Sequence, residues 1–294
     1  MKLFDLHCDT ALSMYHRGLG FDNDKLHITS DRMAAFDEVC QTFAIFSSPR
    51  LSDDECYKTF FEAKAHLDKS LEEYKGKAKL TPILAIEDAK LLAGDISRVR
   101  VLADCGVRFM TLQWYGDTCI GGGFNTSNGL TDFGKEVVRE CFRCGIVPDV
   151  SHASVETFYD VAKIADGRTF MATHSNSRAL LDHPRNLTNE QFGIICESGG
   201  VVGVSVYAVH LTPDGKDCTV DSVCDHIIHY LSLGGENCTC LGCDLDGIDV
   251  APEGIDGIDK LTRIAERLAT RGVSDELIEK VFYTNGMKFI ETAR

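Results

Sequence analysis

The first apolar run of the chain ends in a histidine and an aspartate that could bind a metal ion together. His7 and Asp9 stand two residues apart in the stretch Asp5-Leu6-His7-Cys8-Asp9. Successive side chains of a strand point to opposite faces, so these two should point to the same face. A neutral imidazole and a carboxylate are natural zinc ligands. On its own, the pair is also consistent with two polar residues that face solvent at a strand end.

Four more side chains of metal-binding type follow later apolar runs, where the corresponding strands should end. They are Glu87 after residues 80–86, His152 after 146–150, His174 after 169–173 and Asp244 after 238–243. Each alone could be a helix cap or a hydrogen-bonded polar residue. In a barrel of parallel strands, however, these ends meet at one mouth, where active sites lie. The set exceeds the ligands of one tetrahedral zinc ion and therefore predicts two ions that share a bridging carboxylate.

Short apolar, β-branched runs alternate with longer segments of helical periodicity along the chain. We predict strands over residues 2–8, 39–46, 80–86, 107–113, 146–150, 169–173, 201–206 and 238–243, and helices that include 52–74, 131–144, 188–198 and 220–233. Two of these helices open with a capping box, Ser52 with Glu55 and Thr188 with Gln191. The alternation predicts a parallel sheet with helical crossovers. Eight such units match a TIM barrel, that is, one α/β domain over residues 1–294.

A doubly wound sheet is the alternative fold. Its first strand is typically followed by a Gly-x-Gly-x-x-Gly turn, which this chain lacks after residues 2–8.

The composition is that of an ordinary globular protein, with 44% hydrophobic and 26% charged residues. The net charge of -15 argues against nucleic-acid and anionic-membrane partners, because phosphate groups favour Lys and Arg. No apolar segment matches a secretion signal, a lipid-anchor signal or a membrane span. We therefore expect a cytoplasmic protein without a membrane partner.

The thirteen cysteines are scattered through the chain, and we expect reduced, mostly buried thiols. Cys141 and Cys144 have C-x-x-C spacing inside a helical pattern, which favours packing over redox chemistry. Cys238, Cys240 and Cys243 lie on an apolar run whose alternation sends Cys243 away from the other two. Core packing is therefore favoured over a zinc–thiolate site there.

A glycine-rich segment, residues 121–123, lacks the helix start and the Lys-Ser/Thr pair of a phosphate-binding loop. We expect a mobile loop over the barrel mouth instead. Seven histidines do not follow a predicted strand and are expected to be surface or structural residues: His16, His27, His66, His183, His210, His226 and His229.

Six stretches carry a resemblance to a known family: Asp5-Leu6-His7-Cys8-Asp9, residues 129–138, Asp149-Val150-Ser151-His152, Thr173-His174-Ser175-Asn176-Ser177-Arg178, residues 182–188 and residues 242–247. The chain resembles the renal (membrane) dipeptidase family, a branch of the metal-dependent amidohydrolase-like barrels, over essentially its whole length.

The resemblance implies a TIM-barrel metallodipeptidase with two zinc ions per chain, and it suggests a homodimer. It implies that His7 and Asp9 bind one zinc, that His152 and His174 bind the other, and that Glu87 bridges the two. Asp244 is then the catalytic carboxylate. Arg185 is expected to hold the terminal carboxylate of the substrate, since a guanidinium can donate two parallel hydrogen bonds to a carboxylate.

The sequence departs from the renal enzymes at the end of the fourth predicted strand. Those enzymes carry a histidine there that helps to bind the scissile group, whereas Thr111-Leu112-Gln113-Trp114 places Trp114 at that position. Trp114 is the only tryptophan of the chain, and we expect it to line the substrate pocket. The metals and water, or another residue, must then stabilise the oxyanion.

These residues together predict a zinc-dependent dipeptidase that cleaves short peptides with a free C-terminal carboxylate, through a hydroxide shared by the two ions. Asp244 is the expected general base and acid. A related amidohydrolase acting on N-acyl amino acids, lactams or other cyclic amides is the nearest alternative, since Arg185 suits any such carboxylate. A catalytically silent metal-binding scaffold should lack a ligand or the acid, and here all six positions are filled. A nuclease barrel can also begin with His-x-Asp, but the acidic charge disfavours it.

Overall fold

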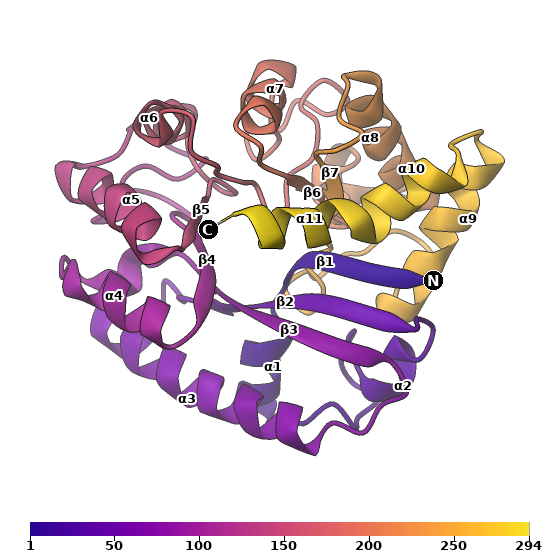
Figure 1. Ribbon diagram of the computed structural model, residues 1–294, viewed down its shortest axis with the longest axis horizontal. Helices are drawn as coiled ribbons and strands as arrows, with labels where there is room; N and C mark the ends of the chain where they lie inside the picture. The colour runs from indigo at the N-terminus through magenta and orange to yellow at the C-terminus, as the bar shows by residue number, and fades with distance from the viewer. Residues whose placement is uncertain (294) are drawn as a thin grey trace.

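The computed structural model describes residues 1–293 and contains seven parallel strands in one curled sheet, in the order β5-β4-β3-β2-β1-β7-β6 (Figure 1). The strands are β1 (Lys2–Cys8), β2 (Glu38–Phe46), β3 (Lys79–Glu87), β4 (Val107–Thr111), β5 (Val147–Asp149), β6 (Val202–Val204) and β7 (Thr239–Leu241). Seven of the eight predicted strands are therefore present, within a few residues of their expected bounds. Every pairing between them is parallel, as the alternation of strands and helices predicts.

The eighth predicted strand, residues 169–173, forms isolated bridges rather than a regular strand. Met171 pairs with Asp149 next to β5, and Ala172 pairs with Val202 of β6. The segment thus lies between the two edge strands of the sheet. Its ladder stops at Thr173, whose backbone N–H donates to the side chain of Asp149 at 2.9 Å instead of to a backbone carbonyl.

Helices follow the strands and form the outside of the molecule (Figure 1). They are α1 (Thr10–Arg17), α2 (Ser30–Met33), α3 (Asp53–Glu73), α4 (Ser97–Asp104), α5 (Asp132–Cys144), α6 (Val155–Ala165), α7 (Asn189–Glu197), α8 (Val220–Ser232), α9 (Thr262–Thr270), α10 (Asp275–Glu279) and α11 (Asn285–Thr292). The capping boxes predicted at Ser52 and Thr188 are both formed, at the starts of α3 and α7. Over residues 1–293, no helix is both long enough and apolar enough to cross a membrane.

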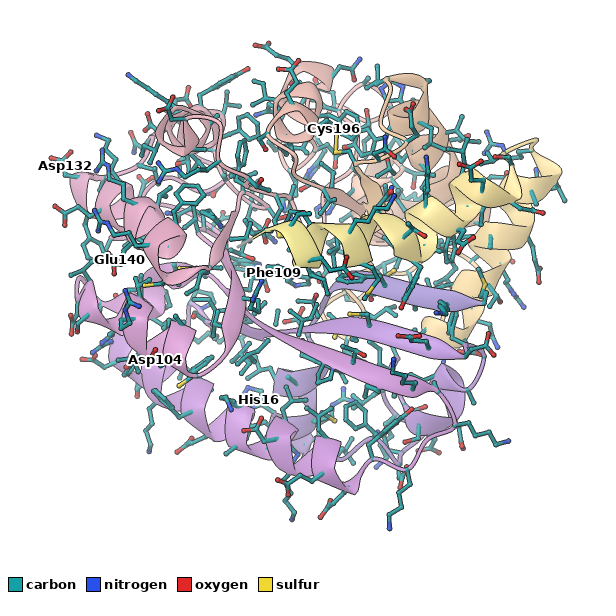
Figure 2. The ribbon with its side chains drawn as sticks, in the orientation of Figure 1. His16, Asp104, Phe109, Asp132, Glu140 and Cys196 are labelled. Atoms are coloured by element: carbon teal, nitrogen blue, oxygen red, sulfur yellow. A yellow bond between two sulfur atoms is a disulfide. The ribbon has the colours of Figure 1, made fainter. Side chains whose placement is uncertain are left out.

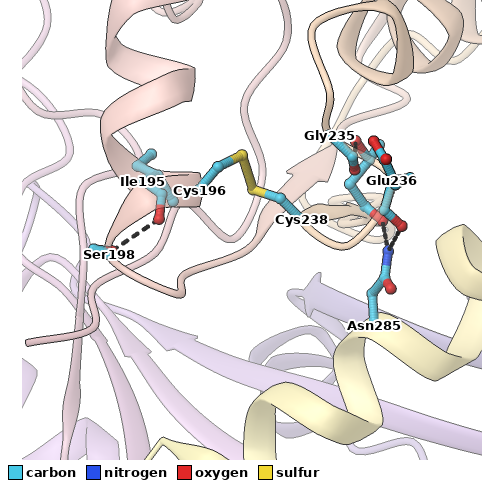
Figure 3. Close-up of a disulfide and its surroundings, with 8 residues drawn as sticks. Ile195, Cys196, Ser198, Gly235, Glu236, Cys238 and Asn285 are labelled. Carbon is cyan, nitrogen blue, oxygen red and sulfur yellow. Dashed lines mark hydrogen bonds between the residues drawn. A yellow bond between two sulfur atoms is a disulfide. The ribbon is translucent and has the colours of Figure 1, made fainter.

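The inner side of the sheet is filled by a small apolar cluster that α11 closes at one end. Side chains from β1 to β5 and from β7 contribute, and Phe289 of α11 joins them. Phe109 is labelled in Figure 2. Its ring centroid lies 6.0 Å from that of Phe289. Asn285 donates its side-chain amide to the carbonyls of Glu236 and Thr239, which fixes α11 to the start of β7 (Figure 3). This apolar layer separates α11 from the carboxyl ends of the strands.

One pair of cysteines contradicts the expectation of reduced thiols throughout. Cys196 of α7 and Cys238, just before β7, form a disulfide with their Cα atoms 5.5 Å apart (Figure 3). The two residues are 42 positions apart, so only the packing of α7 beside the start of β7 reveals the pairing. Cys141 and Cys144 are free, as predicted, and Cys141 is buried against the sulfur of Met110.

Candidate active site

Histidines and carboxylates meet where the strands end. His7 is the second-last residue of β1 and Glu87 is the last residue of β3. His152 and Asp244 follow β5 and β7 by three residues. The backbones of His152 and Asp244 have φ values of 66° and 63°. Residues other than glycine rarely adopt this left-handed backbone conformation, and those that do are concentrated at functional sites.

His7 faces three carboxylates. Its Nε2 lies 3.7 Å from Oδ2 of Asp9, 3.8 Å from Oε2 of Glu87 and 3.8 Å from Oδ1 of Asp244. This Nε2 is buried and has no hydrogen-bond partner. A buried polar atom without a partner costs free energy, so we expect a bound group between this nitrogen and the three carboxylates. A cation fits that position.

A second group of atoms that could bind a metal ion lies beside His7 and its carboxylates. Nε2 of His152 and Nε2 of His174 are 2.8 Å apart, and Oε1 of Glu87 lies 3.0 Å from the former and 3.6 Å from the latter. The two oxygens of Glu87 therefore face different groups, Oε1 the pair of histidines and Oε2 His7. This is the placement expected of a carboxylate that bridges two metal ions.

Burial and neighbouring charges shift the pKa values of Glu87, Asp244 and His7. Burial, with Asp9 as the next cause, raises the pKa of Glu87 well above its usual range. Burial also raises the pKa of Asp244, to about 7. Burial acts to lower the pKa of His7, but Asp9, Glu87 and Asp244 outweigh it and raise that pKa to about 10.

The two other histidines behave in the opposite way. Burial holds the pKa of His152 and of His174 well below the usual value, so both rings are neutral. Neutral imidazoles are the form that ligates zinc, and at His7 a bound cation would replace the proton that the three carboxylates favour. Imidazole nitrogens and carboxylate oxygens are zinc donors, and a divalent cation compensates the buried carboxylates, so the residues present fit zinc.

A cavity of about 560 Å³ opens above these donor groups and is large enough for a small ligand. Asp9, Glu87, His152 and Asp244 line it, whereas His7 and His174 lie beneath. Trp114 lines it too, as predicted, with its ring centroid 4.9 Å from that of Phe46 and 6.2 Å from that of His152.

Arg185 also lines this cavity, and it reaches the cavity from a loop. Its guanidinium donates to the carbonyl of His174 at 2.9 Å and to Oγ of Ser175 at 3.0 Å, while its Nε has no partner. Burial lowers the pKa of Arg185 to about 10, so the group stays charged at neutral pH. A buried cation with free N–H groups at a cavity wall is suited to hold an anion.

Three of the histidines that we expected to be surface or structural residues line this cavity instead: His16, His183 and His210. Tyr207 and Phe124 line it as well. The rule that identified the metal-binding candidates also applies to Tyr207, which directly follows the predicted strand 201–206. His16 shows no such signal, because it reaches the cavity from α1, one turn after Ser13.

The glycine-rich loop borders the cavity through Phe124, as its expected position over the mouth implies. Its glycines are tied to neighbouring backbone, however. Gly121 bridges Leu130, Gly122 bridges Asp117, and Gly123 bridges Ala153. These antiparallel bridges anchor the loop, where the sequence suggested mobility.

Gly247 lines the cavity at a point where no side chain fits. A Cβ there would overlap the carboxylate oxygens of Asp9 and Asp244. We expect G247A to weaken zinc binding about 10- to 100-fold, the range seen when groups that orient metal ligands are disturbed. Competition with a chromophoric chelator measures this. G193A is the matched control, since a Cβ at Gly193 meets nothing within 4 Å. Unchanged zinc affinity in G247A would contradict the role of Asp9 as a metal ligand.

A parallel α/β sheet with metal-binding side chains at its carboxyl edge defines a metal-site protein with an amidohydrolase-like fold. The chain belongs to the membrane dipeptidase family, peptidase family M19, whose family model matches residues 1–294. An uncharacterized dipeptidase of Schizosaccharomyces pombe is 32% identical over 218 residues, which are 70% of this chain and 53% of the yeast protein. The chain thus spans about half the length of that relative.

The chain is also similar to one further protein sequence and to solved structures. A protein encoded in the pqqA 5′ region of Klebsiella pneumoniae is 30% identical over 72% of this chain and 82% of its own length. A metallo peptidase from Rhodobacter sphaeroides, solved with a phosphinate mimic of the dipeptide L-Ala-D-Ala, superposes with a TM-score of 0.93 at 24% identity and covers 100% of this chain and 99% of its own. The probable dipeptidase PvdM from Pseudomonas aeruginosa gives 0.89 at 19%, over 100% and 95%. The two structural likenesses show the shared fold.

Proposed function

We propose that this protein is a zinc-dependent dipeptidase with two metal ions in one site. The observation that carries the proposal is the position of Glu87, whose two carboxylate oxygens face two separate groups of ligand atoms at the base of the cavity. Membership of the dipeptidase family supports it. We further propose that the sheet is a (β/α)8 barrel in which the Met171–Ala172 segment takes the place of the remaining strand.

His7 and Asp9 hold one zinc in this proposal, His152 and His174 hold the other, and Glu87 binds both. When bound, the ions supply a water of lowered pKa and polarise the scissile carbonyl. Asp244 lies 3.8 Å from Nε2 of His7, at the cavity wall, where it can take the proton of that water and return it to the leaving amine.

Arg185 sets the length of the substrate. The cavity has its ligand atoms at the base and the Arg185 guanidinium in its wall, so a substrate whose carboxylate pairs with Arg185 presents a nearby amide to the metals. Trp114 lines the cavity beside His152 and is proposed to contact the substrate. An N-acyl amino acid also carries a free carboxylate next to an amide, so it belongs in the test.

We expect R185K to lower kcat/KM for dipeptides about 100-fold, because a lysine loses the planar, two-bond grip on the carboxylate. Steady-state kinetics with a dipeptide and with its C-terminal amide measure this. The kcat/KM of the wild type should be lower for the amide than for the dipeptide by a similar factor. In R185K the two values of kcat/KM should be nearly equal.

The same kinetics decide the substrate class. Faster cleavage of N-acyl amino acids than of any dipeptide would reassign the protein to the related amidohydrolases. An R185K enzyme that still favours the free carboxylate as strongly as the wild type would contradict the role of Arg185.

A further inference from the structure

Asp149 is fully buried, and its side-chain carboxylate accepts four hydrogen bonds. Its Oδ1 accepts the backbone N–H groups of Ser151 at 2.8 Å and Thr173 at 2.9 Å. Its Oδ2 accepts the hydroxyls of Thr111 at 2.5 Å and Thr173 at 2.6 Å. Four donors fill the acceptor sites of one carboxylate. Asp149 therefore connects β4, β5 and the segment before His174.

The contact with Asp149 determines what the Thr173 hydroxyl can do elsewhere. A hydroxyl has one proton to donate, and that of Thr173 goes to Asp149. Its oxygen must then accept at its other contacts. Nδ1 of His174 lies 2.8 Å away, Oγ of Ser151 3.3 Å and Nδ1 of His7 3.4 Å. The oxygen has two lone pairs, so the short contact with His174 takes one, and His7 shares the other with Ser151. His174 thus carries its proton on Nδ1, which leaves the lone pair on Nε2, the atom that faces Glu87 and His152.

The backbone of Thr173 is held as closely as its side chain. Its carbonyl oxygen lies against Gly203 and Gly242, where any Cβ would overlap it. Its backbone N–H is bound to Asp149 at 2.9 Å. The position of the hydroxyl is therefore defined by backbone packing on one side and by the hydrogen bond to Asp149 on the other.

We propose that Asp149 and Thr173 are positioning residues for the metal centre. The Thr173 hydroxyl, with its proton held by Asp149, fixes the tautomer and the ring orientation of His174 and, through the longer contact, of His7. These two histidines belong to different ligand groups, so one hydroxyl serves both proposed zinc sites. This inference rests on the proposed zinc centre of the preceding section. Outer partners of this kind typically contribute 10- to 100-fold to metal affinity.

The test compares T173V with T173S in a zinc titration against a chromophoric chelator. Valine keeps the shape of threonine but removes the hydroxyl, whereas serine keeps the hydroxyl. We expect T173V to bind zinc about 10- to 100-fold more weakly and T173S to stay near the wild type. The visible spectrum of the cobalt(II)-substituted protein, which reports ligand geometry, should change in T173V and not in T173S.

T42V is the matched control, because Thr42 is a buried strand threonine whose hydroxyl has no hydrogen-bond partner. It should bind zinc as the wild type does. D149N, in which an amide NH2 replaces one acceptor, should repeat the loss seen in T173V. T173V with wild-type affinity, or T173S as weak as T173V, overturns the positioning role. A wild type that binds no zinc in the same titration overturns the proposed function instead, so the two failures are distinguishable.

Discussion

Replacement of Asp244 by asparagine is expected to lower kcat for dipeptide hydrolysis about 10³-fold while both zinc ions stay bound. Asparagine has the size of aspartate and tolerates the left-handed backbone at this position, where φ is 63°. It cannot take up a proton, however. In the proposed mechanism Asp244 takes one proton from the water and returns it to the leaving amine. Loss of activity without loss of metal is thus the mark of a proton-transfer residue.

The measurement for D244N combines steady-state kinetics with metal analysis of the same preparation. D214N is the matched control, because Asp214 also has a positive φ, of 56°, but is exposed and does not line the cavity. The control should keep wild-type kcat. Loss of zinc from D244N would make Asp244 a ligand rather than the base, a role that its 3.8 Å distance from Nε2 of His7 also allows.

Replacement of Glu87 by glutamine is expected to reduce the zinc content from two ions per chain to one or fewer. An amide offers one acceptor oxygen where the carboxylate offers two, and here the two oxygens face different donor groups. We expect the affinity for at least one ion to fall by more than about 100-fold, the upper end for loss of an outer partner, with hydrolysis lost in parallel.

Metal analysis after dialysis, followed by zinc titration, measures the change in E87Q. E38Q is the matched control, since Glu38 begins β2 at the opposite end of the sheet and pairs with Lys2 and Lys79. It should retain two ions. If E87Q also retained two ions with wild-type affinity, Glu87 would not be a bridge.

Much of the site could be located from the sequence because a parallel sheet brings the ends of its strands together. His7, Glu87 and Asp244 each stand at the end of an apolar run. Such residues can be identified from the sequence once the strands are assigned, because parallel strands end at one mouth of the barrel. In the structure, Nε2 of His7 lies 3.8 Å from a carboxylate oxygen of each of the other two. Their chemical roles remain predictions that the variants above test.

Other residues carry no such signal. His16 reaches the cavity from a helix, and His210 lies in a short 3-10 helix after β6, so their positions depend on how the loops fold back. The pairing of Cys196 with Cys238 depends on the packing of α7 against β7, and nothing local to either residue predicts it.

The segment before His174 shows how side-chain hydrogen bonds change a strand. Its apolar run predicts a regular strand, but the N–H of Thr173 turns to Asp149 and the ladder ends. Strand propensity and apolar periodicity describe how a segment is buried, and they cannot predict this hydrogen bond. The contact is also what places the Thr173 hydroxyl beside His174.

The most direct test of the account is hydrolysis of a panel of L,L- and L,D-dipeptides by protein of measured zinc content, before chelation, after chelation and after zinc is restored. The account predicts about two zinc ions per chain and cleavage that chelation abolishes and zinc restores. Two ions without cleavage of any dipeptide would move the activity to other amides. No stoichiometric zinc, even after zinc is added, would contradict the metal centre itself.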